Sequence, residues 1–166
     1  MNSISELKMI FLVTWSVLLV VAPVRAAENT VDAIELVRAS YRTDRQAVVA
    51  EALQLTESES AGFWPLYQAY RADMDKLGDG LVKLVLEYSD AYPNVPEERA
   101  RQMLKEYSAI EEKLGSKRAW YYKRAAKVLP ATKTLRWAQV ENRMDLVLRL
   151  QLAGNIPLMP VPPTKP

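Results

Sequence analysis

The chain has 166 residues with 22 Lys and Arg against 20 Asp and Glu, so its formal net charge is +2. It contains no His and no Cys. These absences exclude disulfides, thiolate nucleophiles, His-dependent catalytic triads, and zinc or copper sites built from imidazole or thiolate. We therefore expect a protein that is not an enzyme and binds no metal or cofactor. The near-neutral charge does not by itself identify a partner.

The N-terminal residues have the layout of a secretory signal. An uncharged run from Met9 to Val24 follows Lys8, and Pro23 ends the run just before small residues, so we expect cleavage after Ala26 or Ala27. The alternative is an uncleaved anchor, but the run is shorter than the roughly 20 apolar residues that span a bilayer. We expect a periplasmic mature protein with no stable membrane anchor and a net charge near neutrality.

The composition between the prolines predicts an all-α fold. Helix-forming residues predominate, Gly occurs only five times, and no segment alternates like a strand. Residues 27–156 are predicted to form a single helical domain, and the proline-rich tail 157–166 is not expected to fold. About four helices are expected: Val31 to Leu53, either continuous or broken near Tyr41 to Thr43, then Glu57 to about Tyr92, Pro96 to Val128, and Ala131 to about Leu152.

Cap patterns and prolines define the predicted helix starts. Thr43 with Gln46, and Thr56 with Glu59, have the spacing of a capping box, in which two side chains satisfy backbone amides of the first turn. Pro65 falls inside the second predicted helix, where it is expected to kink the helix or split off its first turns.

The two central helices have matching apolar series with heptad spacing. This pattern predicts a long antiparallel hairpin, closed by a turn at residues 92–95, with arms of about 50 Å. Such a hairpin is elongated and leaves apolar surface for the other helices or for a second copy of the chain, so we expect a homodimer. The first series comprises Phe63, Tyr67, Tyr70, Met74, Leu77, Leu81, Leu84 and Tyr88, and the second Ala100, Met103, Tyr107, Ile110, Leu114, Tyr121 and Val128.

Two acidic arrangements do not have the spacing of a functional site. A calcium loop beginning at Asp73 would need a bidentate Glu at its twelfth position, where Leu84 stands. Adjacent acids such as Glu97 and Glu98 point about 100° apart on a helix and do not converge on one atom. Both arrangements are better explained as solvated helix surface.

A basic and aromatic region extends from Lys113 to Val140, without a single acid. In one interpretation its aromatic residues belong to the core or a dimer interface and its bases to the solvated side of the third helix. In the other it is a binding surface for unfolded or acidic polypeptide or for anionic headgroups, because Arg, Tyr and Trp offer adaptable contacts. The predicted binding residues are Lys117, Arg118, Trp120, Tyr121, Tyr122, Lys123, Arg124, Lys127 and Trp137.

The start of the second predicted helix resembles the first signature of the Spy/CpxP-like, LTxxQ-motif family of periplasmic stress proteins. The motif residues are Leu55, Thr56, Glu59, Phe63, Trp64 and Pro65, with Glu59 where that family has Gln. In that family a second copy of the motif opens a later helix. At the corresponding place in this chain, Leu129 matches the motif and little else does. The resemblance implies an elongated helical hairpin that forms a cradle-like dimer and acts as an ATP-independent chaperone, a dampener of stress sensors or a metal-resistance accessory. The His or Cys residues of the metal-binding members are absent.

The sequence thus favours a chaperone-like protein that holds unfolded envelope proteins without ATP. The alternative is an interaction module that docks a membrane stress sensor or an anti-sigma factor. A structural envelope protein is a third interpretation, and nucleic acid is not an expected partner of a secreted protein.

Overall fold

The computed structural model describes residues 45–154 and 156–161. Within these residues every regular element is helical: residues 45–53, α2 (Glu57–Ala91), α3 (Glu97–Ala125) and α4 (Ala131–Ala153). The predicted all-α class and the helical hairpin are therefore confirmed. The predicted signal, the helix start at Val31 and the cap at Thr43 lie outside the described residues, and the tail is described only to Val161.

The first turn of α2 is closed by the predicted capping box. The Thr56 hydroxyl accepts from the backbone N–H of Glu59 at 3.3 Å, and the Thr56 N–H donates to Glu59 Oε2 at 2.8 Å. α2 continues through Pro65, so the predicted division of this helix does not occur. Pro65 removes one backbone donor, but Phe63 and Tyr67 on either side are buried in the core and hold the chain in the helix.

α3 and α4 begin directly after prolines. Pro96 and Pro130 stand at the N-cap positions in extended conformations, and neither makes a side-chain cap. Glu97 and Glu98 lie in the first turn of α3, while Lys123 and Arg124 lie in its last turn, so both ends complement the helix dipole.

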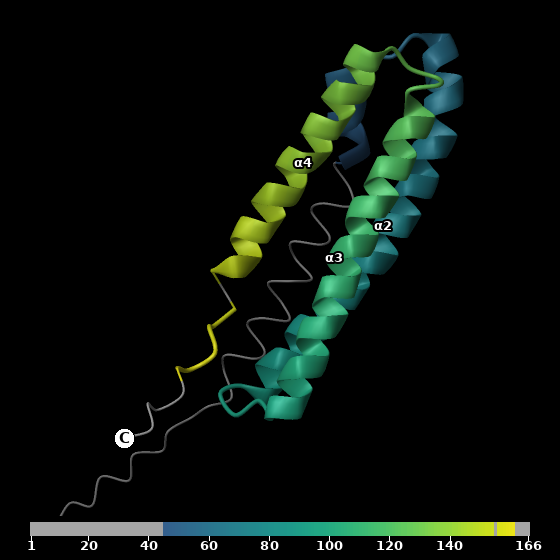
Figure 1. Cartoon of the computed structure of the whole chain (residues 1–166). Helices are drawn as coiled ribbons and strands as arrows, with labels where there is room; N and C mark the ends of the chain where they lie inside the picture. Colours follow the sequence, from purple (N-terminus) through teal and green to yellow (C-terminus); the bar gives the residue numbers. More distant parts are fainter. Residues whose placement is uncertain (1–44, 155, 162–166) are drawn as a thin grey trace, which may run out of the picture.

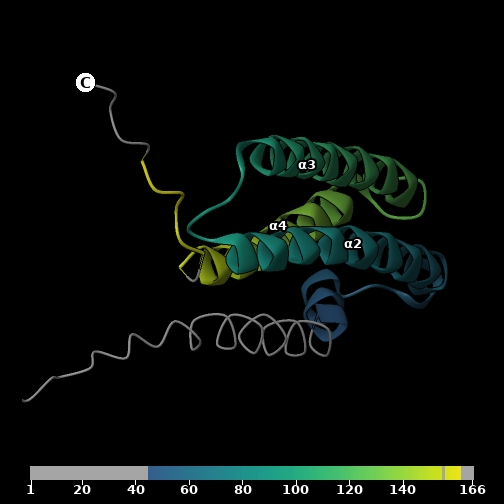
Figure 2. The same ribbon diagram turned by 90° about the horizontal axis from the view of Figure 1, so that it is seen from below.

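The helix of residues 45–53 ends with a left-handed residue that sequence reasoning did not anticipate. Gln54 has φ of 43°, and its N–H donates to the carbonyl of Ala50 at 3.1 Å. This is the geometry of a left-handed C-terminal cap, usually supplied by Gly. Gln54 reverses the chain so that residues 45–53 lie on the side of α2 away from α3 (Figure 2).

α2 and α3 run antiparallel along their lengths and form the predicted hairpin (Figure 1). α4 begins beside the C-terminal end of α3 and runs back along the hairpin, where Arg149 Nη2 donates to Glu111 Oε1 of α3 at 2.9 Å, and the molecule is elongated (Figure 1). The apolar series of α2 faces inward, and Gly80 allows α3 to come close, since a Cβ there would lie 3.1 Å from Ile110 Cδ1. Two members of the α3 series, Tyr107 and Val128, are instead exposed.

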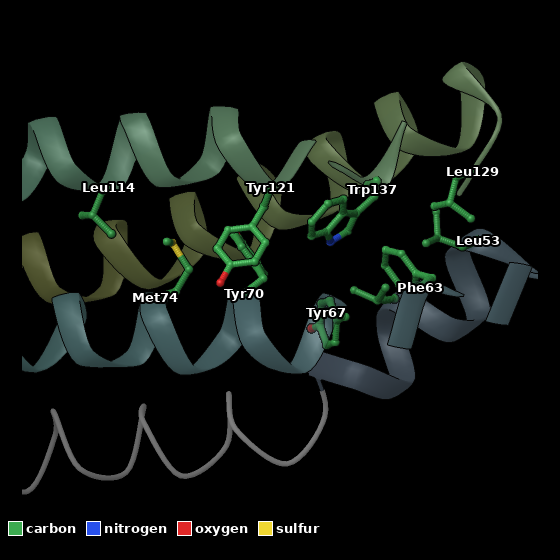
Figure 3. Packing of buried hydrophobic residues seen from close by; sticks show 11 residues of the cluster. Leu53, Phe63, Tyr67, Tyr70, Met74, Leu114, Tyr121, Leu129 and Trp137 are labelled. Atoms are coloured by element: carbon green, nitrogen blue, oxygen red, sulfur yellow. The ribbon is translucent and has the colours of Figure 1, made fainter. Parts of the chain in front are cut away.

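The core is concentrated where all the helical segments meet (Figure 3). The residues buried there come from every described helix and from the α3–α4 connection, and most are aromatic or branched. They are Val49, Leu53, Phe63, Tyr67, Tyr70, Met74, Leu114, Tyr121, Ala125, Leu129 and Trp137.

Candidate functional site

Trp137 is the centre of the aromatic core and is fully buried. Its ring lies edge-on to Phe63 at 5.3 Å, to Tyr70 at 5.0 Å and to Tyr122 at 5.0 Å between centroids (Figure 3). The prediction that Trp137 contacts a partner at the surface is therefore wrong. The other interpretation of this region, in which its aromatic rings belong to the core, holds for Trp137.

Tyr121 and Tyr122 also point into the molecule rather than out of it. Tyr121 is buried, packs against Tyr70 at 5.4 Å between centroids, and donates from its hydroxyl to Asp73 Oδ2 at 2.9 Å. Tyr122 is half-buried against Trp137. Tyr121 is therefore wrongly predicted as a surface contact. Burial raises the pKa of the Tyr121 hydroxyl, and its hydrogen bond to Asp73 adds to that effect.

Some of the predicted binding cations form ion pairs with carboxylates of the described residues, and others do not. Lys117 Nζ lies 2.8 Å from Asp73 Oδ2, and Arg118 Nη2 lies 2.5 Å from Asp145 Oδ2. Arg118 is partly buried, so it links α3 to α4 and is a structural residue. Lys123 and Lys127 are exposed, and neither forms an ion pair with a carboxylate in the described part of the chain.

The exposed residues form one stripe along α3. Residues separated by four and three positions share a helix face, and this spacing aligns four exposed side chains of α3, with a fifth, Lys127, in the turn just after the helix. Trp120 retains 45% of its surface, Arg124 stacks over its ring at 3.8 Å from the centroid, and the Lys117 ammonium lies 5.9 Å from the same centroid. We call this set the α3 stripe: Lys113, Lys117, Trp120, Arg124 and Lys127. Lys123 lies beside it.

The sequence contained the signal for this stripe. The α3 stripe and the buried Leu114, Tyr121 and Ala125 have related spacings but are shifted by one residue, so the two sets lie about 100° apart around α3. The sequence interpretation treated Lys113 to Val140 as one region. It therefore grouped side chains that point into the core with side chains that are exposed. Separating the phases would have assigned Trp120 and Tyr121 to different faces.

A second polar cluster, absent from the sequence interpretation, surrounds the fully buried Glu141 of α4. Glu141 Oε2 accepts from the Tyr70 hydroxyl at 3.2 Å and lies 3.6 Å from Arg45 Nη1 and 3.7 Å from Arg71 Nη1. Arg45 also donates to Asp145 Oδ1 at 2.5 Å. The cluster thus joins residues 45–53, α2 and α4.

Burial determines the protonation of this cluster. Desolvation raises the pKa of Glu141, although Arg45 and Arg71 oppose that effect. Glu141 Oε1, the Tyr67 hydroxyl and Trp137 Nε1 are buried without a hydrogen-bond partner among the described residues. Buried polar atoms in this state cost free energy. Burial likewise raises the pKa values of Tyr67 and Tyr70, so both phenols stay protonated.

The LTxxQ-like residues lie at the opposite end of the core from the hairpin turn. Phe63 is fully buried, while Leu55 and Trp64 are half-buried against the core. Glu59 closes the cap of α2 and also accepts from Lys133 Nζ of α4 at 2.6 Å. The Lys133 hydrogen bond, with that from Thr56, lowers the pKa of Glu59. These motif residues therefore anchor α2 to α4.

A cavity of about 180 Å³ lies between α2, α3 and α4, beside the Glu141 cluster. Its walls are mainly apolar, and charged side chains line its edges. The apolar residues are Met74, Leu81, Val82, Val85, Leu114, Leu148 and Leu152, and the charged ones are Arg45, Arg71, Asp75, Asp79, Arg118, Asp145 and Arg149.

Two further features are absent from the residues that the structure describes. These residues contain no cluster of acidic side chains suited to a metal ion. Among them, no helix combines the length and apolar character needed to cross a bilayer. No family model matches the chain, and neither the curated proteins nor the solved structures include a match.

Proposed function

We propose that this protein is an exported, non-enzymatic binding protein that holds unfolded envelope polypeptides without ATP. The α3 stripe is the observation that carries the proposal. It offers three cations, Lys113, Arg124 and Lys127, that make no ion pair with a described carboxylate, and one aromatic ring held in place by Arg124. A flat cationic and aromatic surface binds acidic and apolar segments of many sequences, since it does not demand one shape.

Exposed apolar side chains on α4 support the same proposal. Leu135, Leu146, Val147 and Leu150 are all more than 45% exposed. Their burial against an unfolded chain would be favourable at about 25 cal/mol per Å² of apolar surface. The resemblance of residues 55–65 to the LTxxQ-motif family points to the same function.

The first test is suppression of light scattering by two unrelated aggregating proteins, without nucleotide and at low and high salt. We expect the protein to suppress both, and salt to weaken the effect because the α3 stripe acts through charge. Failure to suppress either protein would contradict the chaperone proposal. The same result would favour the alternative, a module that docks one membrane stress sensor or anti-sigma factor. A pull-down from envelope extract would test this alternative, which predicts capture of one partner with a defined stoichiometry.

A triple charge reversal identifies the binding surface. Lys123→Glu, Arg124→Glu and Lys127→Glu together should abolish suppression while the protein stays helical, because all three side chains are exposed; the melting temperature should fall only slightly, through the last turn of α3. The control variant is Lys76→Glu, Lys105→Glu and Arg143→Glu. It makes the same change in net charge at exposed sites on α2, α3 and α4 away from Trp120, and it should suppress like the parent. Equal loss in both variants would contradict a localised surface.

Export is a separate part of the proposal and has its own test. Expression of the whole chain in a Gram-negative host should yield a periplasmic product whose mass corresponds to cleavage after Ala26 or Ala27. An intact product in the membrane fraction would instead favour the uncleaved anchor.

A further inference from the structure

We propose that two tyrosines beside the hairpin turn, Tyr88 and Tyr92, form a docking site for extended, proline-containing polypeptide. In the structure the chain's own C-terminal tail occupies this site, through a hydrogen bond between Tyr88 and Pro157. We call the two tyrosines the tip site. The inference goes beyond the proposed function, because binding at the tip site does not require the α3 stripe.

The tip site is an exposed aromatic surface at the C-terminal end of α2. Tyr88 lies in the last turn of the helix and Tyr92 is its C-cap, whose N–H donates to the carbonyl of Tyr88 at 2.9 Å. The two ring centroids are 6.0 Å apart, and the ring planes are inclined by 55°. Tyr92 keeps 38% of its surface exposed. The pair therefore offers apolar ring surface next to a hydroxyl donor.

α4 delivers the tail to this surface. The helix ends at Ala153, and four residues later the carbonyl oxygen of Pro157 accepts from the Tyr88 hydroxyl at 2.7 Å. Burial raises the pKa of that hydroxyl, so it keeps the proton that it donates. Aromatic-lined surfaces bind proline-rich segments in the polyproline II conformation, whose backbone carbonyls have no internal partner.

The tail has the sequence of such a ligand. Pro157 and Pro160 are three residues apart, and the same interval recurs in the sequence at Pro163 and Pro166. Polyproline II has three residues per turn, so prolines at this interval share one edge of the segment. Residues 156–161 make no backbone–backbone hydrogen bond with another described residue, so their carbonyls are available to a side-chain donor. The fixed proline φ also lowers the entropy cost of docking.

The tail makes a small contact and can therefore exchange with other segments. Leu158 and Val161 remain 89% and 88% exposed, and Met159 remains 45% exposed. An occupant that buries so little leaves the site open for part of the time, so it lowers the affinity for a competitor without excluding it. Polyproline II is also a major conformer of unfolded chains, so segments of this class are abundant in unfolded polypeptide.

Peptide binding measured by fluorescence anisotropy tests the tip site. The probe is a labelled, end-capped peptide with the sequence of residues 154–163, none of which has a charged side chain. It is titrated with the protein and with the variant Pro157→Gly, Pro160→Gly, whose own tail is no longer preorganised. We expect this variant to bind the peptide about 3- to 10-fold more tightly, because its tip site is open for more of the time. Equal affinities would overturn the proposal, since the tail would not compete for the peptide's site.

Tyr88→Phe, made in the Pro157→Gly, Pro160→Gly variant, identifies the donor. It keeps the ring and removes only the hydroxyl, and it should weaken peptide binding about 2- to 10-fold, the usual effect of losing one neutral hydrogen bond. The control is Tyr107→Phe, at a tyrosine of α3 that is 48% exposed, and it should leave the affinity unchanged. Unchanged affinity in the Tyr88→Phe variant would overturn the proposal.

Salt separates the tip site from the α3 stripe. The peptide's side chains are uncharged, so raised salt should leave its affinity nearly unchanged, whereas salt weakens binding that depends on Lys and Arg. A peptide affinity that falls with salt would place the peptide on the α3 stripe and overturn the tip site. A protein that binds the peptide through Tyr88 but suppresses no aggregation would support this inference and contradict the chaperone proposal.

Discussion

Phe63 and Trp64 are adjacent in the sequence but differ in burial, because neighbouring side chains on a helix point about 100° apart. Phe63 is fully enclosed by Trp64, Tyr67 and Trp137, whereas Trp64 is half-buried at the edge of the same cluster. The sequence analysis listed both among the motif residues without distinguishing how far each is buried. Only Phe63 leaves a closed cavity when it is truncated.

Phe63→Ala should therefore lower the free energy of unfolding by about 3 to 5 kcal/mol, and Trp64→Ala should cost clearly less. Urea unfolding followed by circular dichroism measures both. Leu135→Ala, at a position 61% exposed, is the control and should change stability by under about 0.5 kcal/mol. Equal costs for Phe63 and Trp64 would contradict the burial difference.

Glu141 should make stability depend on pH. Its pKa is raised in the folded state, mainly by burial, so the folded protein holds this proton more tightly than the unfolded chain. That contribution is fully present below the ordinary Glu pKa of 4.5 and is lost as pH rises through the raised value. Stability relative to Glu141→Gln should therefore fall as pH increases across this window.

The measurement is urea unfolding of the parent and Glu141→Gln at several pH values from about 4 upwards. Exposed carboxyls contribute equally to both proteins and cancel in the difference. A difference that grows more favourable to the parent with rising pH would mean that Arg45 and Arg71 outweigh the desolvation of Glu141.

At the scale of elements, the cap of α2 also connects two helices. Glu59 bonds the backbone of Thr56 and the ammonium of Lys133, and that ammonium also donates to the carbonyl of Gln54 at 3.0 Å. One side-chain group thus fixes the start of α2 against α4 and the preceding turn. The sequence indicated the capping box through its three-residue spacing, but nothing in the sequence linked Lys133 to it.

Thr56→Ala should destabilise the protein by about 1 kcal/mol, the usual effect of losing an N-cap hydroxyl. Thr56→Ser keeps the hydroxyl and serves as the control, with little change expected. Thermal unfolding followed at 222 nm compares them. A Ser variant as unstable as the Ala variant would show that the methyl group, rather than the hydroxyl, is what the site requires.

For the whole molecule, the exposed apolar side chains of α4 are where the expected homodimer contact would compete with the proposed binding of unfolded polypeptide. Leu146, Val147 and Leu150 lie on one exposed side of the helix. If two copies bury this face, Leu146→Glu with Leu150→Glu should give a monomer that retains its helicity. Sedimentation equilibrium over a concentration series measures the change.

The matched control places two acids at other exposed positions of the same helix, Gln139→Glu and Asn142→Glu. This variant should sediment like the parent. A parent chain that is monomeric at every concentration would contradict dimerisation, and it would leave the α4 face available for the proposed binding of unfolded polypeptide.

The sequence by itself determined the three long helices and the hairpin, although α3 ends at Ala125 and not at the predicted Val128. Proline positions, the capping box at Thr56 and Glu59 and the heptad spacing of Phe63 to Tyr88 act locally, so these features can be read from neighbouring residues. The same local rules could not place Gln54 in its left-handed conformation, because Gly is the residue expected there.

Tertiary structure alone decided which side of each amphipathic helix is covered. Trp137 and Glu141 are one turn apart on α4, and both are fully buried because α2, α3 and residues 45–53 converge there. No local pattern distinguishes a buried Glu from a solvated one, since its burial depends on Arg45 and Arg71, far away in the sequence.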